Sequence, residues 1–557
     1  MKGKNTLNEL DEITKDNIAR VLWARNFEDA QISVNVLDSL KSQENSSESF
    51  GRRMKYRLQE LIDNPDSFTP SYKKRYQKFI EHSDSLSALQ AYAMTHLLGL
   101  DSVKGYQKIP DKANLKFPET HIPQFGYQVG WHFFVGNCKG ENGKEYGILF
   151  LFYRYTLLPP PVAKRFGISD LENQIFEFQL AVGEAGNIHY QSKPLAVAGT
   201  TGLANVSNLP FNYSIGKNSI QSLKDDSMFP LRLRGWGVNL EHSPVELEVD
   251  LTLSSNKDFL LQGKNGCLPC CCDMGTLYYS ATNLSLDPTK SILKINGEEI
   301  RLVEGKFWFD HQWGNGLEPL GNPRCETLRA ANNMAVSHSR GWDWFMAQFD
   351  GMRELTMYAP HTDENIEFYE QTGNEPPETM TVKVKGQLIE KDNTVRDITG
   401  TLKIPEWIKS ERSSDPNMYK ITNTWYPNKW EFSFDENVPE DIRNFTMVPI
   451  VQGGQSGFNA SGAQYSEGAV YIKDKTGNII GKGFAESVYY ANVVKNMLEL
   501  AGLPVTPDMI ELVKKPFPSL GLKIRSFLYL LMPANRKKLE KALKKCIEQG
   551  LPKSMVG

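Results

Sequence analysis

The chain has three regions that differ in the spacing of their hydrophobic residues. Before residue 100, apolar side chains recur at helical spacing, as in the stretch LNELDEITKDNIARVLWARN. Helical spacing returns after residue 490, where prolines separate the apolar stretches. We therefore predict a helical N-terminal region over residues 1–105 and a helical C-terminal region over residues 493–557.

The region between these helices has short apolar or alternating stretches divided by Gly, Asn, Asp and Pro. Examples are YGILFLFYRYTLL, VELEVDLTL and GAVYIKD. Many short strands at this spacing predict antiparallel sheet, folded as sandwiches or barrels. The region is too long for one barrel, so the expected fold is mainly β with two such units. We place them at residues 106–318 and 319–492, because a polar, irregular stretch follows Gly316.

Composition and charge exclude several classes of partner. The formal net charge is −3 and apolar residues make up 40% of the chain, which is typical of a globular protein without a nucleic-acid partner. No apolar run approaches the ~20 residues that cross a bilayer, and the N-terminus lacks an apolar signal segment. We expect a cytoplasmic protein. The last predicted helix is basic on one face, so it could lie in solvent or touch an anionic membrane surface peripherally.

Four cysteines are crowded into the stretch CLPCCCD, and they are Cys267, Cys270, Cys271 and Cys272. A Cys-x-x-Cys pair supplies half of a structural zinc site, which needs four ligands. No second pair follows, since the next cysteine is the isolated Cys325. We predict reduced cysteines in a turn or strand and no metal cofactor, while a reactive or metal-scavenging thiol stays an alternative.

The stretch GKFWFDHQWGNG sets titratable side chains among aromatic ones. Side chains of a strand alternate between its two faces. One face would carry Phe307, Phe309, His311 and Trp313, and the other would carry Trp308, Asp310 and Gln312. The stretch could hold metal ligands, a proton-transfer pair, or a hydrogen-bonded polar pair in a sheet interior.

The motifs of cofactor-dependent chemistry are absent from the sequence. Only nine histidines occur, and none pairs with another at the spacing of metal ligands. The chain has no G-x-S-x-G nucleophile motif, Walker loop or dinucleotide-binding unit. Acid–base chemistry in an aromatic pocket remains, with a hydrophobic small molecule as the partner and no cofactor. Aromatic rings there can stabilise a cation by their π faces.

Five stretches in order carry a family resemblance. They are the GYQVGWHFF hairpin that runs to Arg154, FLLQGKNG with GTLYYSATNL, GKFWFDHQWG, GWDWFMAQF, and YSEGAV with GKGFAES. Together they resemble the lipocalin-like family of carotenoid hydratases (hydroxyneurosporene synthases), which also holds kievitone-hydratase-like enzymes and decalin-forming Diels–Alderases. The likeness spans about residues 117–492.

This resemblance implies two packed lipocalin-like β units with an apolar pocket in or between them. It also implies a loop, not a metal site, at the cysteine cluster. Carotenoid hydratases protonate a terminal alkene and add water to the cation. Their His-x-Trp pair matches His311 and Trp313, and the following strand reads Gly341-Trp342-Asp343-Trp344, without the tyrosine of the hydratases.

The leading hypothesis is a cofactor-independent enzyme that hydrates or cyclises a polyene or isoprenoid-like substrate after protonating a C=C bond. Asp343 or Asp310 would be the general acid, with His311 as its partner or as the water activator. Glu467 and Glu486 are further candidates for the acid, or carboxylates bonded to Arg154. The residues expected to contact substrate are Trp313, Trp342, Trp344, Phe309, Tyr279, Arg154, Trp131 and His132.

Two other functions fit the same residues. A pericyclase would fold a polyene for ring closure without any essential carboxylate. A non-catalytic carrier of a lipid or pigment would hold its ligand unchanged, with the terminal helices as contacts to a partner or a membrane.

Overall fold

The structure is a computed structural model that describes most residues between 106 and 490. Positions outside the description in this span are 111, 157–159, 166–168, 193–194, 200–201, 240–243, 270–274, 316–341, 362–375, 410–424, 452–455, 459–463 and 489. The helices expected in residues 1–105 and 493–557 lie outside the described residues. So do Cys270, Cys271, Cys272 and Cys325.

The first part of the described chain forms one antiparallel sheet of 15 strands. The strands are β1 (Val129–Gly140), β2 (Glu145–Thr156), β3 (Gln174–Glu184), β4 (His189–Gln191), β5 (Leu195–Ala198), β6 (Ala204–Ser207), β7 (Asn212–Ile215), β8 (Asn218–Ser222), β9 (Leu231–Asn239), β10 (Val245–Ser255), β11 (Leu260–Leu261), β12 (Cys267–Pro269), β13 (Gly275–Leu286), β14 (Ile292–Ile295) and β15 (Glu298–Asn315). The main path runs β4-β3-β2-β1-β15-β13-β10-β9-β8-β7-β6.

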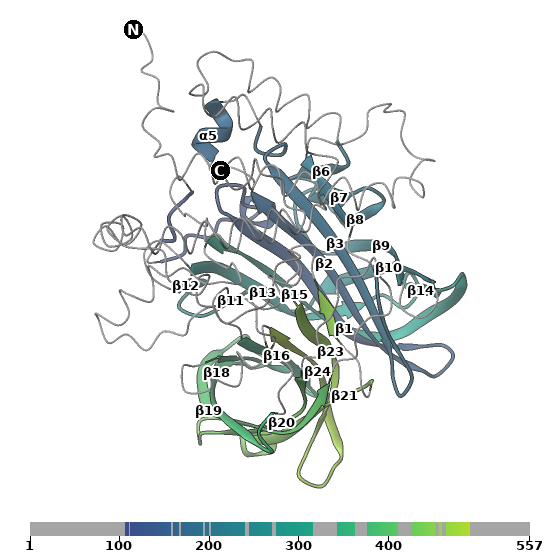
Figure 1. The fold of residues 1–557 in the computed structure, drawn as a ribbon, viewed down its shortest axis with the longest axis vertical. Helices are drawn as coiled ribbons and strands as arrows, with labels where there is room; N and C mark the ends of the chain where they lie inside the picture. Colours follow the sequence, from purple (N-terminus) through teal and green to yellow (C-terminus); the bar gives the residue numbers. More distant parts are fainter. Residues whose placement is uncertain are drawn as a thin grey trace, which may run out of the picture.

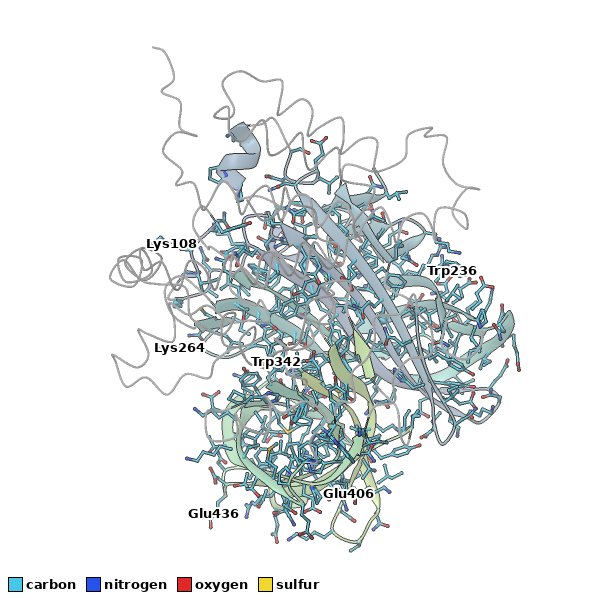
Figure 2. The ribbon with its side chains drawn as sticks, in the orientation of Figure 1. Lys108, Trp236, Lys264, Trp342, Glu406 and Glu436 are labelled. Carbon is cyan, nitrogen blue, oxygen red and sulfur yellow. The ribbon has the colours of Figure 1, made fainter. Side chains whose placement is uncertain are left out.

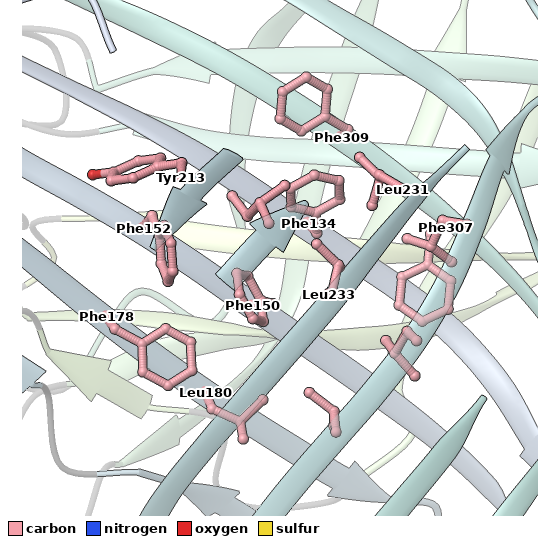
Figure 3. Packing of buried hydrophobic residues seen from close by; sticks show 14 of the residues in the cluster. Phe134, Phe150, Phe152, Phe178, Leu180, Tyr213, Leu231, Leu233, Phe307 and Phe309 are labelled. Carbon is pink, nitrogen blue, oxygen red and sulfur yellow. The ribbon is translucent and has the colours of Figure 1, made fainter. Parts of the chain in front are cut away.

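This sheet curls around its own hydrophobic core. Alternate residues of the long strands point inward, so Phe134 of β1, Phe150 and Phe152 of β2 and Phe309 of β15 lie in one buried cluster (Figure 3). Strand β3 also contacts β9, so the two halves of the sheet approach one another. The inner face is therefore filled by rings and aliphatic side chains, and the outer face is left for other contacts.

The second part of the chain forms a closed antiparallel barrel. Its strands are β16 (Trp342–Phe349), β17 (Arg353–Pro360), β18 (Met380–Ile389), β19 (Val395–Lys409), β20 (Trp425–Phe434), β21 (Asn444–Pro449), β22 (Ser456–Phe458), β23 (Gln464–Lys473) and β24 (Ile479–Val488). Strand β21 pairs with both β20 and β23, so eight strands close a ring and β22 adds at its side. The barrel has its own core, separate from that of the first sheet.

The prediction of a mainly β fold is confirmed, and of the two expected barrel or sandwich units the second is a closed antiparallel barrel of eight strands. The first unit is one large curled sheet, which sequence patterns alone did not separate from a barrel or a sandwich. Among the described residues the helical elements are α5 (Pro160–Arg165) and the 3-10 turns η2 (Glu119–His121) and η5 (Glu440–Ile442). The part of the chain that the structure describes holds no helix long and apolar enough to cross a membrane.

The barrel packs its outer wall against the outer face of the first sheet, where β1 and β2 meet β23 and β24 (Figure 1). The contact is close, because a Cβ atom added to Gly147 would lie 2.3 Å from Cβ of Ala469. Apolar side chains from both sheets form the buried layer between them. They are Phe133, Val135, Leu149, Leu151, Ala181, Leu260, Trp308, Trp344, Met346, Ile389, Ile450, Val451, Ala469 and Phe484.

A buried ion pair locks one side of this interface. Lys257, which follows β10, donates to Glu354 of β17 at 2.6 Å, and both side chains are at most 1% exposed. The ammonium also donates to the carbonyls of Met352 and Glu390, and Asn283 donates to the second carboxylate oxygen. A buried charge is tolerated only when it is paired and fully hydrogen-bonded, and this pair meets that condition.

Substitution of one partner of this pair should destabilise the protein strongly. We expect Lys257→Met to lower the free energy of unfolding by about 3–5 kcal/mol, because Glu354 would keep a buried charge without its cation. The double variant Lys257→Met with Glu354→Leu should recover much of that loss. Urea denaturation followed by intrinsic fluorescence measures both. A loss in the single variant no greater than in the double variant would contradict the assigned role.

Candidate functional site

Three carboxyl groups meet in the interface between the sheet and the barrel. Asp310 projects from β15 toward the barrel, on the face that also carries Trp308. Glu467 of β23 and Glu486 of β24 are direct cross-strand partners on the barrel wall, beside Trp344 of β16. Electrostatic coupling connects Asp310 to both glutamates. We call this interface region, with the aromatic residues described below, the acid slot.

Asp310 is held by three donors. Its carboxylate accepts hydrogen bonds from the Tyr278 hydroxyl at 2.6 Å, from Nε1 of Trp308 at 2.6 Å and from the Ser280 hydroxyl. Donors of this kind favour the ionised form and burial disfavours it. Burial dominates, since the side chain is 3% exposed and the pKa of Asp310 is raised to about 7. The three bonds fix this carboxyl firmly in place.

The two glutamates lie directly opposite each other on neighbouring strands. Directly opposite side chains on neighbouring strands have Cβ atoms about 4.5–5.5 Å apart, so two negative charges there repel each other strongly. Burial is the main cause that raises the pKa of Glu486 to about 7 and the pKa of Glu467 well above its usual range. Nε1 of Trp342 donates to Glu486 at 3.1 Å, whereas Oε1 of Glu467 has no hydrogen-bond partner in the part of the chain that the structure describes. At neutral pH the pair therefore holds at least one proton.

Aromatic rings line both walls of the acid slot. On the sheet, Trp131 and Tyr153 stack with an interplanar angle of 6° and a centroid distance of 5.4 Å. On the barrel, Trp344 meets Phe133 and Trp308 edge to face. Trp131, Tyr153 and Trp342 are half-buried, so solvent reaches the slot on their side. Figure 2 shows Trp342 where the barrel adjoins the first sheet.

His311 lies on the other face of β15, inside the curled sheet. Its ring stacks on His132 at 3.9 Å and contacts Trp313 and Tyr279. Nε2 of His132 donates to the carbonyl of His121, and Nδ1 of His121 shares a 2.8 Å hydrogen bond with the Tyr279 hydroxyl.

Burial keeps these three imidazoles neutral. It lowers the pKa of His121 to about 4, that of His132 to about 3 and that of His311 well below its usual range. The structure therefore does not bring His311 to Asp310 as a partner. The physical reason is the alternation of side chains along one strand, which separates adjacent residues onto opposite faces.

Asp343 lies inside the barrel, on the opposite face of β16 from Trp342 and Trp344. It accepts hydrogen bonds from the hydroxyls of Ser487 at 2.5 Å and Tyr490 at 2.7 Å. Nε2 of His361 is 3.7 Å from the same carboxylate. Asp343 thus has a hydrogen-bonded environment of its own and does not reach the acid slot.

Several other expected site residues have structural surroundings. Arg154 is buried and donates to Thr156, Gln174 and the carbonyls of Tyr127, Val129 and Gln124, so it bonds to neither glutamate. Phe309 belongs to the core of the first sheet. Cys267 is buried with its Sγ 3.1 Å from the carbonyl of Pro110. Within the described ranges, no three His, Cys, Asp or Glu side chains converge as metal ligands.

The family model described as AttH-like matches residues 108–489, which is most of the chain. The chain belongs to the AttH-like family. This membership confirms the resemblance inferred from the five motifs.

Two solved structures match this AttH-like chain over 69% of its length. A Nitrosomonas europaea protein assigned as AttH is 18% identical, with a TM-score of 0.46 and 99% of that chain covered. Kievitone hydratase from Nectria haematococca is 13% identical, with a TM-score of 0.42 and 97% covered. No curated protein sequence matches the chain.

Four slot residues of this AttH-like protein were not expected as site residues from the sequence, although side-chain alternation had placed Trp308 on the face of Asp310. Trp308, Ser280 and Tyr278 bind Asp310, and Tyr153 stacks on Trp131. The spacing held a usable signal for two of them, because Trp308 is two residues before Asp310 and Ser280 two after Tyr278. Each pair therefore shares a face of its strand.

The raised pKa values of the slot predict how stability changes with pH. The pKa of Asp310 and of Glu486 is about 7 in the folded protein, while unfolded carboxyls titrate near 4. Between these values the unfolded chain releases protons that the folded chain keeps. The contribution of these two carboxyls to the free energy of unfolding is therefore full below pH ~4 and is lost as pH rises through about 7.

Glu486→Gln should make the decline in stability with rising pH shallower between pH 5 and pH 7. Urea midpoints at several pH values measure it, with the exposed Glu436→Gln as the control. Parallel curves for the wild type and Glu486→Gln would show that Glu486 does not keep a proton in the folded protein over this pH range.

Proposed function

We propose that this AttH-like protein is a cofactor-independent enzyme that protonates a C=C bond of a hydrophobic polyene or isoprenoid-like substrate in the acid slot. Hydration or cyclisation would follow. The carrying observation is the pair Glu467 and Glu486, which keeps a proton near neutral pH between indole rings. A general acid is most effective when its pKa lies near the working pH, and this pair meets that requirement.

The pair supports both proton transfers of a hydration. One protonated carboxyl transfers its proton to an alkene carbon, which leaves a carbocation and a carboxylate. Water then adds to the cation, and the extra proton of the water returns to a carboxylate of the pair. The sum is alkene plus water to alcohol, and the enzyme recovers its starting protonation state. In a cyclisation, a second double bond of the substrate replaces water as the nucleophile, and loss of a proton to the same carboxylate ends the reaction.

The surroundings of the pair suit a cationic intermediate. Trp342 and Trp344 lie in the row next to Glu486, and the π face of an indole stabilises a nearby cation. The new carboxylate charge adds an attraction that is strong in a region with little water. The apolar layer of Phe133, Leu151 and Trp308 suits a hydrocarbon chain.

Asp310 has a supporting role in this scheme. Its oxygens are already engaged by Tyr278, Ser280 and Trp308, so a substrate carbon has less access to them than to the carboxyls of the glutamate pair. Its negative form raises the pKa of both glutamates through electrostatic coupling. We assign proton donation to the glutamate pair and assign Asp310 the task of keeping that pair protonated.

Variants of the pair provide the main test. Glu467→Gln and Glu486→Gln should each lower turnover by at least ~10²-fold, because a positioned general acid contributes 10²–10⁴-fold. Ligand retention should persist in Glu486→Gln, since the amide conserves shape. The matched control is Glu145→Gln, which removes an interface carboxylate that binds Lys482 and Tyr471 outside the slot.

The readout is mass spectrometry of small molecules that copurify with the protein and are then incubated with it in heavy-oxygen water. Gain of one labelled water identifies hydration, and altered retention at constant mass identifies cyclisation. Full turnover in both glutamine variants would exclude acid catalysis by the pair and favour a pericyclase. A bound compound that never changes would identify a carrier.

A further inference from the structure

Among the described residues, the carboxyls of the acid slot have no lysine or arginine partner, whereas two other carboxylates at the interface do. Glu354 is paired with Lys257, and Glu145 with Lys482, both at or below 2.7 Å. Asp310, Glu467 and Glu486 form no ion pair with any described Lys or Arg, and the charges that act on the two glutamates are all carboxylates. The described lysines thus pair with carboxylates around the slot and with none of its three carboxyls.

A second observation indicates a missing hydrogen-bond donor. Among the described residues, Oε1 of Glu467 has no hydrogen-bond partner, although the side chain is only 3% exposed. Nearly all buried polar atoms in proteins are hydrogen-bonded, so an orphaned carboxyl oxygen marks a position where a ligand can donate. This oxygen lies on the barrel wall that faces the sheet, in the row of Glu486 and Trp344.

The open side of the slot is aromatic. The half-buried rings of Trp131 and Tyr153 stack in parallel, and half-buried Trp342 lies on the barrel wall. Indole and phenol faces attract ammonium groups through their quadrupole, and sites for organic cations commonly combine such rings with a carboxylate. Both elements occur here within one interface.

We propose that the acid slot binds an organic cation, namely a protonated amine joined to an apolar chain, with an N–H group donating to Oε1 of Glu467. If the proposed function holds, such an amine is the class of its substrate. Only this identification as a substrate rests on the proposed function; the binding of the cation does not. The chain of the ligand would lie along the apolar layer, and its ammonium group would supply the charge that the protein omits.

Binding of such a cation should displace a proton. The groups that face the glutamate pair are Asp310 from β15, Tyr278 from β13, Tyr465 from β23 and Trp342 from β16. Asp343 acts on Glu486 only through space, from the inner side of the barrel wall. None of these groups is cationic, so an ammonium ion favours the ionised carboxylate. One protonated carboxyl and one ammonium ion form an ion pair, and the proton of the carboxyl is released to solvent. The second glutamate keeps its proton and remains available as the general acid.

Calorimetry with three probes of one chain length tests the charge preference. Octylammonium, octanol and octanoate present a positive, a neutral and a negative head on the same chain. We expect octylammonium to bind at least tenfold more tightly than octanol at pH 8, and octanoate to bind most weakly. The advantage should shrink several-fold at pH 6, where the carboxyls hold their protons. Titrations in two buffers of different ionisation enthalpy should show release of up to one proton.

Variants assign the effect to the slot. Glu467→Gln should remove the preference for octylammonium over octanol, while Glu145→Gln should keep the preference. Equal affinities of octylammonium and octanol at pH 8, or an unchanged preference in Glu467→Gln, would overturn the proposal. Either result leaves the turnover assay with labelled water unaffected, so failure here is distinguishable from failure of the proposed function.

Discussion

The closely packed contact between the barrel wall and the outer face of the curled sheet is the constraint on which the other features depend. Backbone and side chains approach so closely at Gly147 and Ala469 that a methyl group there would collide. Once the two walls are this close, water is excluded between them and every polar group there needs a partner or a proton. The Lys257–Glu354 pair meets that demand on one side. In the acid slot, Asp310 meets it with three hydrogen-bond donors and the glutamate pair meets it by keeping a proton.

Burial of these carboxyls links folding to chemistry. The exclusion of water that stabilises the apolar layer also raises the pKa of Asp310 and Glu486 to about 7. A carboxyl that stays protonated at neutral pH is costly for a protein to maintain, and it is also the group required to protonate an alkene. The carboxyl groups of the slot therefore reduce stability as the pH rises, and the same property makes them suitable proton donors.

Three separate polar environments lie close together in the chain but on different surfaces. The histidines are neutral inside the curled sheet, the acid slot lies between the two sheets, and Asp343 is bonded to two hydroxyls inside the barrel. Neighbours in sequence thus belong to different sites. His311 and Asp310 are adjacent, as are Asp343 and Trp344, yet the alternation of strand side chains separates each pair.

The sequence by itself determined the mainly β fold, the family and the two faces of the strand at Phe307–Trp313, because side-chain alternation and turn residues are local properties. It also named Glu467 and Glu486, since they stand in recognisable strand motifs. Only the tertiary structure decided which of the acidic residues meet. Pairing of β23 with β24 places the two glutamates opposite each other, and docking of the barrel brings Asp310 from about 160 residues earlier in the chain to them. Burial, and with it the protonation state, follows from that long-range contact and is not a local property of any single strand.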